Sequence, residues 1–299
     1  MSLLAGVGGA SYPGIEACWR IIERLRDTPI NGTLRVIPMA DIAAFLDRSE
    51  HLCPLDGRPL ATALAAGTIK ADDSATGAIA RAIAGALAGS DFHIELRGGD
   101  HTEVHAHWVV DVPPADTPTV TAGHVAGACG ADFRVVFDRA GQWPLRPATA
   151  GIMAARGVPS LLLSTGGLGH EFDGDADTLV ADVLRVMQAL DVVETIDAPD
   201  AVTPRLVGPR IWSHAVARSA LWVPDATAGS PVASGDPLGQ VWDYFGNPIE
   251  DVAAPFDGVV LAITTSMAVS APPLVNGDSW PGRTVTLAES TTPDRSSDD

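Results

Sequence analysis

Two regions with different hydrophobic patterns divide this sequence, and their order constrains the fold more than any other feature. Up to about residue 195, short apolar runs such as 34–38 and 160–163 alternate with segments of helical spacing such as 14–26 and 177–190. Strands that alternate with helices are typical of an α/β sheet sandwich. Beyond residue 210 the helical spacing disappears, and short runs broken by Gly-Asp, Gly-Asn and Asp-Gly turns indicate a small β-domain.

These patterns predict where the domains begin and end. We expect an α/β domain over residues 1–196, a linker over 197–209, a β-barrel-like domain over 210–278 and a disordered tail over 279–299. The linker is expected because the segment contains three prolines. The tail is expected because it ends in the polar run TTPDRSSDD.

Charge and cysteine usage limit the partners and the compartment. The net charge of −18 would repel phosphates, which argues against nucleic acid and anionic membranes as partners. The sequence has no apolar stretch of about 18 residues or more and no basic leader segment, so we expect neither a membrane span nor a signal peptide. Cys18, Cys53 and Cys129 form no CxxC pair, so no disulfide framework is indicated. We expect a cytoplasmic protein.

Several ordered motifs carry a resemblance to a known family. They are AGVGGASYPGIE at 5–16, VIPMADIAAF at 36–45, PLDGRPL at 54–60, IELRGGD at 94–100, LSTGGLG at 163–169, GDPLGQ at 235–240 and APFDG at 254–258. In this order they resemble motifs of the succinylglutamate desuccinylase/aspartoacylase family of zinc deacylases. The resemblance covers residues 2–277 and implies an α/β fold: a zinc-carboxypeptidase-like mixed sheet flanked by helices, with a smaller C-terminal all-β domain. The family activity would be amide hydrolysis of N-acyl amino acids.

The positions that carry the family's chemistry are altered in this sequence. Relatives bind one Zn²⁺ through the His and Glu of HxxE and a distant His in DLHG, and a Glu of ExGG acts as the base. The matching positions are Gly8, Ser11 and Arg97 for the ligands and Ser164 for the base. Glycine has no donor, a serine hydroxyl is a weak zinc ligand, and a permanent guanidinium charge would repel Zn²⁺. The sequence therefore predicts no cofactor at the ancestral site and no conventional zinc deacylase, and leaves open whether the chain is an enzyme.

Arg97 has two interpretations. It could hold a carboxylate or an oxyanion where zinc once supplied the positive charge, or it could pair with Glu95 or Asp41 and fill the space. A small carboxylate-bearing molecule is the expected ligand under the first interpretation. The candidate binding residues are Tyr12, Asp41, Asp56, Arg58 and Arg97.

The segment that follows the IELRGGD motif is rich in histidine. On an extended strand alternate residues share a face, so we expect four side chains to point the same way: His101, Glu103, His105 and His107. They could hold a relocated divalent metal or form a polar strand at the rim of the pocket. The candidate catalytic residues are Glu95, Arg97, His101, Glu103 and His105. Ser164 could act as a nucleophile only with a base such as His101 or His105 beside it, and is otherwise a small spacer.

Three functional hypotheses follow. The leading one is a metal-free, catalytically degenerate homologue that binds a small carboxylate ligand or acts as an accessory subunit. The second is a repurposed enzyme that uses residues around 95–107 for acid/base or relocated-metal chemistry. The third is a divergent zinc-dependent N-acyl amino acid amidohydrolase. Relatives usually have a few tens of residues before the first motif, so we also expect an exposed sheet edge and a homo- or hetero-oligomer with an active homologue.

Overall fold

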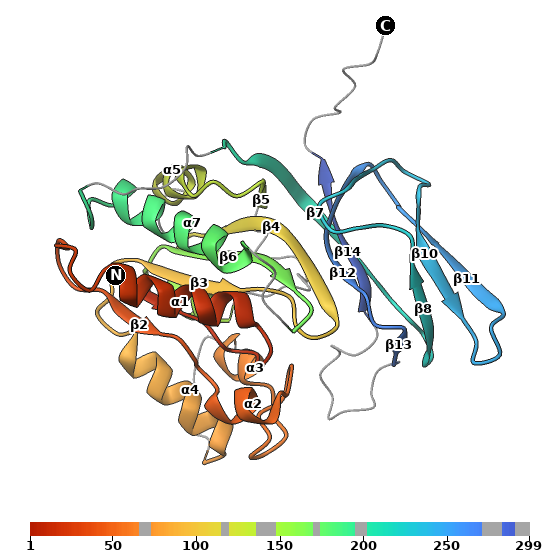
Figure 1. The fold of residues 1–299 in the computed structure, drawn as a ribbon, viewed down its shortest axis with the longest axis horizontal. Coiled ribbons are helices and arrows are strands. Elements are labelled where there is room, and N and C mark those ends of the chain that lie inside the picture. The colour runs from red at the N-terminus through yellow and green to blue at the C-terminus, as the bar shows by residue number, and fades with distance from the viewer. Residues whose placement is uncertain are drawn as a thin grey trace, which may run out of the picture.

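The computed structural model describes residues 1–65, 73–114, 120–135, 148–169, 174–194, 202–270 and 283–290 (Figure 1). Strands and helices alternate through the first two thirds of the chain, as the periodicity predicts. They are β1 (Ser2–Leu4), α1 (Tyr12–Arg24), β2 (Arg35–Ile37), α2 (Ile42–Asp47), α3 (Leu60–Ala65), α4 (Ala75–Ala86), β3 (His93–Arg97), β4 (Glu103–Val112), α5 (Val120–Ala128), β5 (Phe133–Val135), α6 (Thr149–Ala155), β6 (Ser160–Gly167) and α7 (Asp175–Ala189).

The central sheet is mixed and covered by helices on both faces. Its strand order begins β2-β1-β3-β6-β4-β5, with β4 antiparallel to β6 and the other neighbours parallel. Apolar residues of α1, α5 and α7 pack on one face, where Ile15, Val125 and Leu179 belong to one buried cluster. Helices α3, α4 and α6 pack on the other face, where Leu64 and Ile152 are buried together. This arrangement confirms the predicted mixed sheet flanked by helices.

The C-terminal part contains strands only, among the residues that the structure describes. They are β7 (Arg205–Ala215), β8 (Ala220–Pro224), β9 (Pro231–Val232), β10 (Pro237–Trp242), β11 (Pro248–Ala253), β12 (Gly258–Thr264), β13 (Ala268–Val269) and β14 (Arg283–Ser290). Strands β7, β14, β12 and β9 continue the central sheet, and β11-β10-β8-β13 form a second sheet. Because β12 pairs both with β14 and with β4, the strands β4, β5, β7, β14 and β12 close a ring.

Two of the predicted boundaries differ from the structure. Strand β7 begins at Arg205, inside the expected linker at 197–209, and pairs with β5. Strand β14 lies inside the expected disordered tail at 279–299 and pairs with β7 and β12. Its polar side chains misled the prediction, but Thr284 and Thr286 are buried and hydrogen-bond to His214 and Ser213 of β7 at 2.7 Å each. The two halves of the chain therefore share one continuous sheet.

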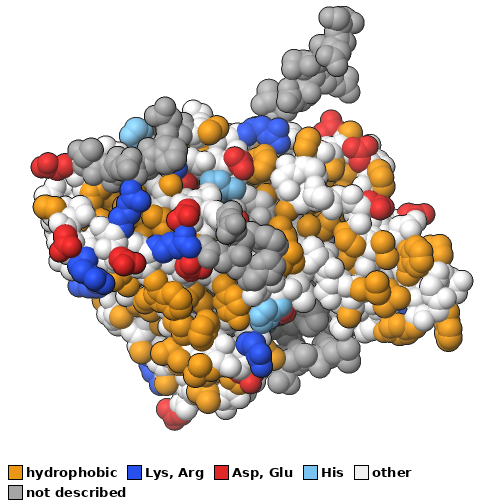
Figure 2. Space-filling view, in the orientation of Figure 1, with side chains coloured by type: hydrophobic (Ala, Val, Ile, Leu, Met, Phe, Trp, Pro, Cys, Tyr) orange, Lys and Arg blue, Asp and Glu red, His pale blue; other side chains and the backbone are white. Residues whose placement is uncertain are grey.

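Hydrophobic side chains gather on the surface over the C-terminal strands (Figure 2). Between β10 and β11, Tyr244 is 68% and Phe245 is 90% exposed. In the part of the chain that the structure describes, no helix is both long enough and apolar enough to cross a bilayer.

Candidate functional site

The motif glycines bring three strand ends into close contact. Strands β3 and β6 pair in parallel with Arg97 opposite Ser164, and each strand is followed or ended by two glycines. The N–H of Gly99 donates to the carbonyl of Gly166 at 2.8 Å. A Cβ atom at Gly99 or Gly167 would lie 2.0 or 2.1 Å from the carbonyl oxygen of Glu103, where β4 begins. Only glycine at these two positions lets β4 approach so closely.

The three positions that match the family's zinc ligands converge at this point, as the resemblance implies. The hydroxyl of Ser11, just before α1, donates to the carbonyl of Gly98, the residue after Arg97, at 3.0 Å. A Cβ atom at Gly8 would lie 4.0 Å from that hydroxyl oxygen but 2.8 Å from the backbone carbonyl oxygen of Glu50. The chain at residue 50 therefore occupies the space that a side chain at position 8 would need.

Arg97 pairs with Glu95. Its Nη2 lies 2.5 Å and its Nε 2.7 Å from Oε1 of Glu95, which is fully buried. The same carboxylate accepts hydrogen bonds from the hydroxyl of Thr149 at 3.1 Å and the N–H of Ala150 at 3.0 Å, at the start of α6. Burial alone would raise the pKa of Glu95, but Arg97 and the hydrogen bond from the N–H of Ala150 hold it below its ordinary value. Asp41, the other expected partner, caps α2 by accepting from the N–H of Ala44 at 2.9 Å.

These residues do not fit the zinc ion that the fold family implies. Gly8 offers no donor atom, Ser11 directs its hydroxyl to a carbonyl, and Arg97 is a cation bound to its own carboxylate. The position of the family's catalytic carboxylate holds Ser164, which is fully buried. A tripodal zinc site requires three side chains with N, O or S donors, and this set does not supply them.

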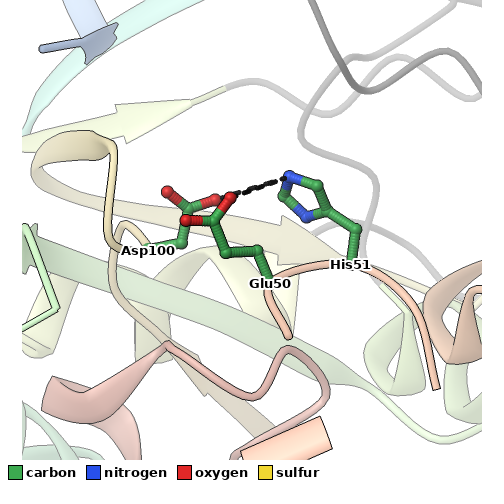
Figure 3. A group of neighbouring side chains, drawn as sticks. All are labelled: Glu50, His51 and Asp100. Atoms are coloured by element: carbon green, nitrogen blue, oxygen red, sulfur yellow. Dashed lines mark ion pairs between the residues drawn. The ribbon is translucent and has the colours of Figure 1, made fainter. Parts of the chain in front are cut away.

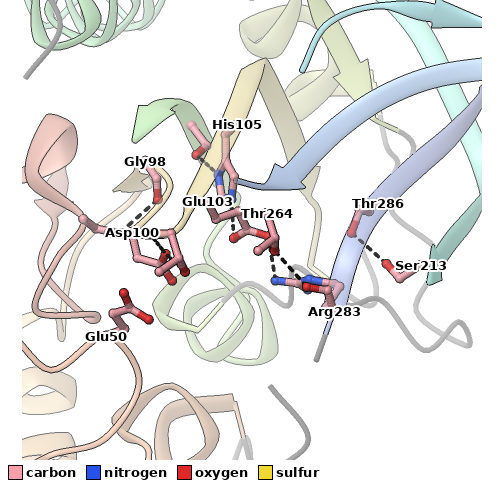
Figure 4. Close-up of polar contacts among 12 residues, drawn as sticks. Glu50, Gly98, Asp100, Glu103, His105, Ser213, Thr264, Arg283 and Thr286 are labelled. Carbon is pink, nitrogen blue, oxygen red and sulfur yellow. Dashed lines mark hydrogen bonds and ion pairs between the residues drawn. The ribbon is translucent and has the colours of Figure 1, made fainter. Parts of the chain in front are cut away.

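A buried chain of hydrogen bonds links Ser164 of β6 to Arg283 of β14, and its members His105, Glu103 and Arg283 are labelled in Figure 4. Oγ of Ser164 lies 2.6 Å from Nδ1 of His105, and Nε2 of His105 lies 3.0 Å from Oε2 of Glu103. Nη2 of Arg283, from β14, donates to Oε1 of Glu103 at 3.2 Å. Burial would raise the pKa of Glu103, but Arg283 and His105 lower it to about 2. Glu103 is therefore an anion at neutral pH, held between two partners.

The histidine-rich segment does not present one face, contrary to the expectation from the sequence. Glu103 and His105 lie together, whereas Nε2 of His107 contacts Asp182 of α7 at 2.7 Å on the opposite face of the sheet. The cause is a β-bulge between His105 and Trp108, which breaks the alternation of side chains. His101 precedes β4 and lies 3.4 Å from the hydroxyl of Tyr12. The four residues therefore do not form a single metal-binding group.

Glu50, His51 and Asp100 form another group of neighbouring side chains (Figure 3). Nε2 of His51 lies 3.8 Å from Oε2 of Glu50 and 3.6 Å from Oδ2 of Asp100. All three residues line a pocket of about 190 Å³, to which Glu103 and Arg283 also contribute. Burial, followed by repulsion from Asp100 and Glu103, raises the pKa of Glu50 to about 7. One donor atom from each of the three residues falls within 4.8 Å of the others, so the group could hold a metal ion.

Sequence reasoning missed Glu50 and His51. They follow α2, and neither belongs to a motif with recognisable metal-ligand spacing. The adjacency of a carboxylate and an imidazole was the available signal, and it is too common to single out a site. Their partner Asp100 is distant in sequence and is brought near by the glycine-dependent turn after β3.

The remaining expected binding residues have structural partners. Asp56 accepts hydrogen bonds from the N–H of Thr76 at 2.8 Å and from its hydroxyl at 2.6 Å, which ties the loop to α4. The carbonyl of Arg58 accepts from the N–H of Cys53 at 2.8 Å in a short bridge. The ring of Tyr12 packs edge-on against His101 and Phe45. The contact of Tyr12 is with the residue that directly follows Asp100 in the sequence.

Comparison with solved structures shows which known fold this chain adopts. No family model matches the sequence, and a search of curated proteins finds no match. Among solved structures, a succinylglutamate desuccinylase/aspartoacylase from Rhodobacter sphaeroides is 20% identical with a TM-score of 0.77, covering 97% of this chain and 85% of that chain. The product-bound ectoine utilization protein EutE (DoeB) from Ruegeria pomeroyi is 17% identical with a TM-score of 0.78 and the same coverage. An aspartoacylase family protein from Mesorhizobium loti is 17% identical with a TM-score of 0.75, again with this coverage. This likeness confirms the fold expected from the motifs.

Proposed function

We propose that this protein is a homologue of the succinylglutamate desuccinylase/aspartoacylase deacylases that lacks their zinc site and their amide hydrolysis, and that binds a small molecule in the pocket lined by Glu50, Asp100 and Glu103. The fold and the order of the motifs support the relationship. The altered residues support the loss of activity, because they are the ones that would hold and use the metal.

The observation that carries the proposal is the closed space at position 8. A histidine there would begin with a Cβ atom 2.8 Å from the carbonyl oxygen of Glu50, a separation that real Cβ atoms do not adopt. The arginine at position 97 is paired with a fully buried carboxylate and cannot release its charge. A single back-substitution would therefore not rebuild a tripodal zinc site.

The charge of the pocket bears on its ligand. Glu50, Asp100 and Glu103 line it, and Arg283 is already paired with Glu103. Three carboxylates oppose an anionic ligand unless a cation joins them. The small carboxylate expected from the sequence stays a prediction, and this pocket would take it only together with a positive ion. An accessory role beside an active homologue also stays a prediction.

The test is hydrolysis of N-acyl amino acids by the full chain. Protein produced with zinc in the medium is assayed with N-acetylaspartate and N-succinylglutamate, alongside a deacylase of proven activity as the positive control. We expect no turnover above the rate without enzyme. Turnover by the unmodified chain that depends on zinc, and that is lost in Ser11→Ala, would overturn the proposal.

A second candidate function, nucleophilic acyl transfer by Ser164, is favoured by one observation. Ser164, His105 and Glu103 are linked in a chain of hydrogen bonds with the roles of nucleophile, base and orienting carboxylate. The full burial of Ser164 opposes it, because a nucleophile must reach its substrate. A fluorophosphonate probe decides the question: labelling of the unmodified protein but not of Ser164→Ala supports it. An unlabelled protein, with a labelled serine hydrolase in parallel, excludes it.

A further inference from the structure

Asp100 is built to present one carboxylate oxygen to the pocket. The residue is only 9% exposed, and its Oδ1 accepts from the N–H of Thr102 at 2.9 Å and from the Thr102 hydroxyl at 3.0 Å. Among the described residues, the hydrogen bonds to this carboxylate all reach Oδ1. Its Oδ2 instead faces Nε2 of His51 at 3.6 Å. The oxygen that points to the pocket is thus oriented but not engaged by a hydrogen bond.

Glu50 is oriented towards the same point. Its Oε1 lies 3.4 Å from Nδ1 of His101, while its Oε2 lies 3.8 Å from Nε2 of His51. Figure 3 shows the carboxylates of Glu50 and Asp100 next to each other, with the His51 ring facing them. Two carboxylates this close repel each other when both are charged. A bound cation would remove the repulsion.

The distances suit a metal ion of common size. A tetrahedral ion with bonds of about 2.1 Å holds its donor atoms about 3.4 Å apart. The separations from His51 to the two carboxylates, 3.6 and 3.8 Å, are slightly larger, so small side-chain rotations would complete the contact. We propose that Glu50, His51 and Asp100 bind one divalent transition-metal ion in the pocket.

This site differs from the zinc site of the deacylase family. None of its three residues occupies position 8, 11 or 97, and Glu50 comes from the segment that closes the space at Gly8. One imidazole and two carboxylates suit Zn²⁺ or Mn²⁺ better than Ca²⁺ or Mg²⁺, which prefer oxygen ligands alone. Three protein ligands leave the ion open to the pocket, where it would attract a carboxylate or another anionic group.

The experiment is metal binding by the full chain after removal of ions with a chelator. Zn²⁺ or Mn²⁺ is titrated by calorimetry, and the bound metal is counted by elemental analysis after gel filtration. We expect one equivalent per chain, and His51→Ala and Asp100→Asn should each weaken binding by at least about tenfold. The matched control is His107→Ala, which removes another histidine paired with carboxylates, Asp132 and Asp182, outside the pocket. It should bind within about twofold of the unmodified chain.

The outcomes separate this inference from the proposed function. His51 is 32% exposed at its side chain, so His51→Ala is expected to fold even if Asp100→Asn disturbs the turn at Thr102. No metal binding, or binding that His51→Ala leaves unchanged, would overturn the metal site. Either result would leave the proposed function, the absence of amide hydrolysis, unaffected. Metal binding together with hydrolysis of N-acyl amino acids would support the site and overturn the proposed function. Metal binding without hydrolysis supports both.

Discussion

Arg97 and Glu95 lie two residues apart on β3 and form an ion pair, with Nη2 2.5 Å from Oε1, in which the carboxylate is fully buried. The arginine stands where the motif comparison places a zinc-binding histidine. The charge of Arg97 is balanced by Glu95, and the same carboxylate accepts hydrogen bonds from Thr149 and Ala150 in the first turn of α6. The ion pair therefore links the end of β3 to the first turn of α6, and a substitution at Arg97 should lower the stability of the fold.

The first prediction concerns this pair. Arg97→Met should lower the free energy of unfolding by about 3 kcal/mol, because it leaves a buried carboxylate without its cation. Arg20→Met is the control: Arg20 pairs with Glu16 and Asp177 on the surface and should cost no more than about 1 kcal/mol. Urea denaturation at pH 7 measures both. Equal losses of unfolding free energy in the two variants would show that the buried ion pair stabilises the fold no more than the exposed one.

A second prediction tests the closed space at position 8. Gly8→Ala should destabilise the chain by about 1–3 kcal/mol, because its Cβ would meet the carbonyl oxygen of Glu50 and displace the segment after α2. Gly85→Ala in α4 is the control, since a Cβ there meets nothing within 4 Å. That change should stabilise by up to about 1 kcal/mol. Thermal unfolding distinguishes them, and a Gly8→Ala protein as stable as the unmodified chain would mean that this space is open.

The third prediction is a pH dependence from His93. The ring is fully buried between Ser2 and Thr149, and burial lowers its pKa from 6.5 to about 4, although Glu95 acts in the opposite direction. Because the unfolded chain takes up a proton below pH 6.5 and the folded chain does not, this contribution to stability is complete above pH 6.5. It is lost as the pH falls to 4, and amounts to about 3 kcal/mol.

His93→Gln should flatten this part of the pH profile. The free energy of unfolding is measured by urea denaturation at pH 7 and at pH 4 for both proteins, and the quantity compared is the difference between the two pH values. The difference should be about 3 kcal/mol smaller in the variant, whatever the cost of the substitution at pH 7. An unchanged difference would mean that His93 is protonated in the folded chain.

Local patterns predicted the fold well and the site poorly, for physical reasons. The close contacts of Gly99 and Gly167 with Glu103 tolerate no side chain, so the motifs that contain these glycines remain recognisable although neighbouring positions such as 97 and 164 differ from the family's motifs. The bulge after His105 leaves no mark in the pattern of polar residues, so His107 was assigned to the wrong face. Glu50 and Asp100 meet only because α2 and the end of β3 pack together, and no spacing along the chain encodes that contact.

The last prediction separates structure from catalysis at Ser164. Ser164→Ala removes the partner of Nδ1 of His105 in a buried environment and should cost about 1–3 kcal/mol. Ser213→Ala is the control, because the hydroxyl of Ser213 also contacts one side chain, Thr286 at 2.7 Å, but at a partly exposed position (Figure 4). This substitution should cost about 1 kcal/mol or less. Metal binding at Glu50, His51 and Asp100 should not change in either variant, since neither serine lines the pocket. If Ser164→Ala were as stable as the unmodified chain while Glu103→Gln was destabilised, the hydrogen bond from Ser164 would contribute nothing to folding. The 2.6 Å contact between Ser164 and His105 would then point to a chemical role for the serine.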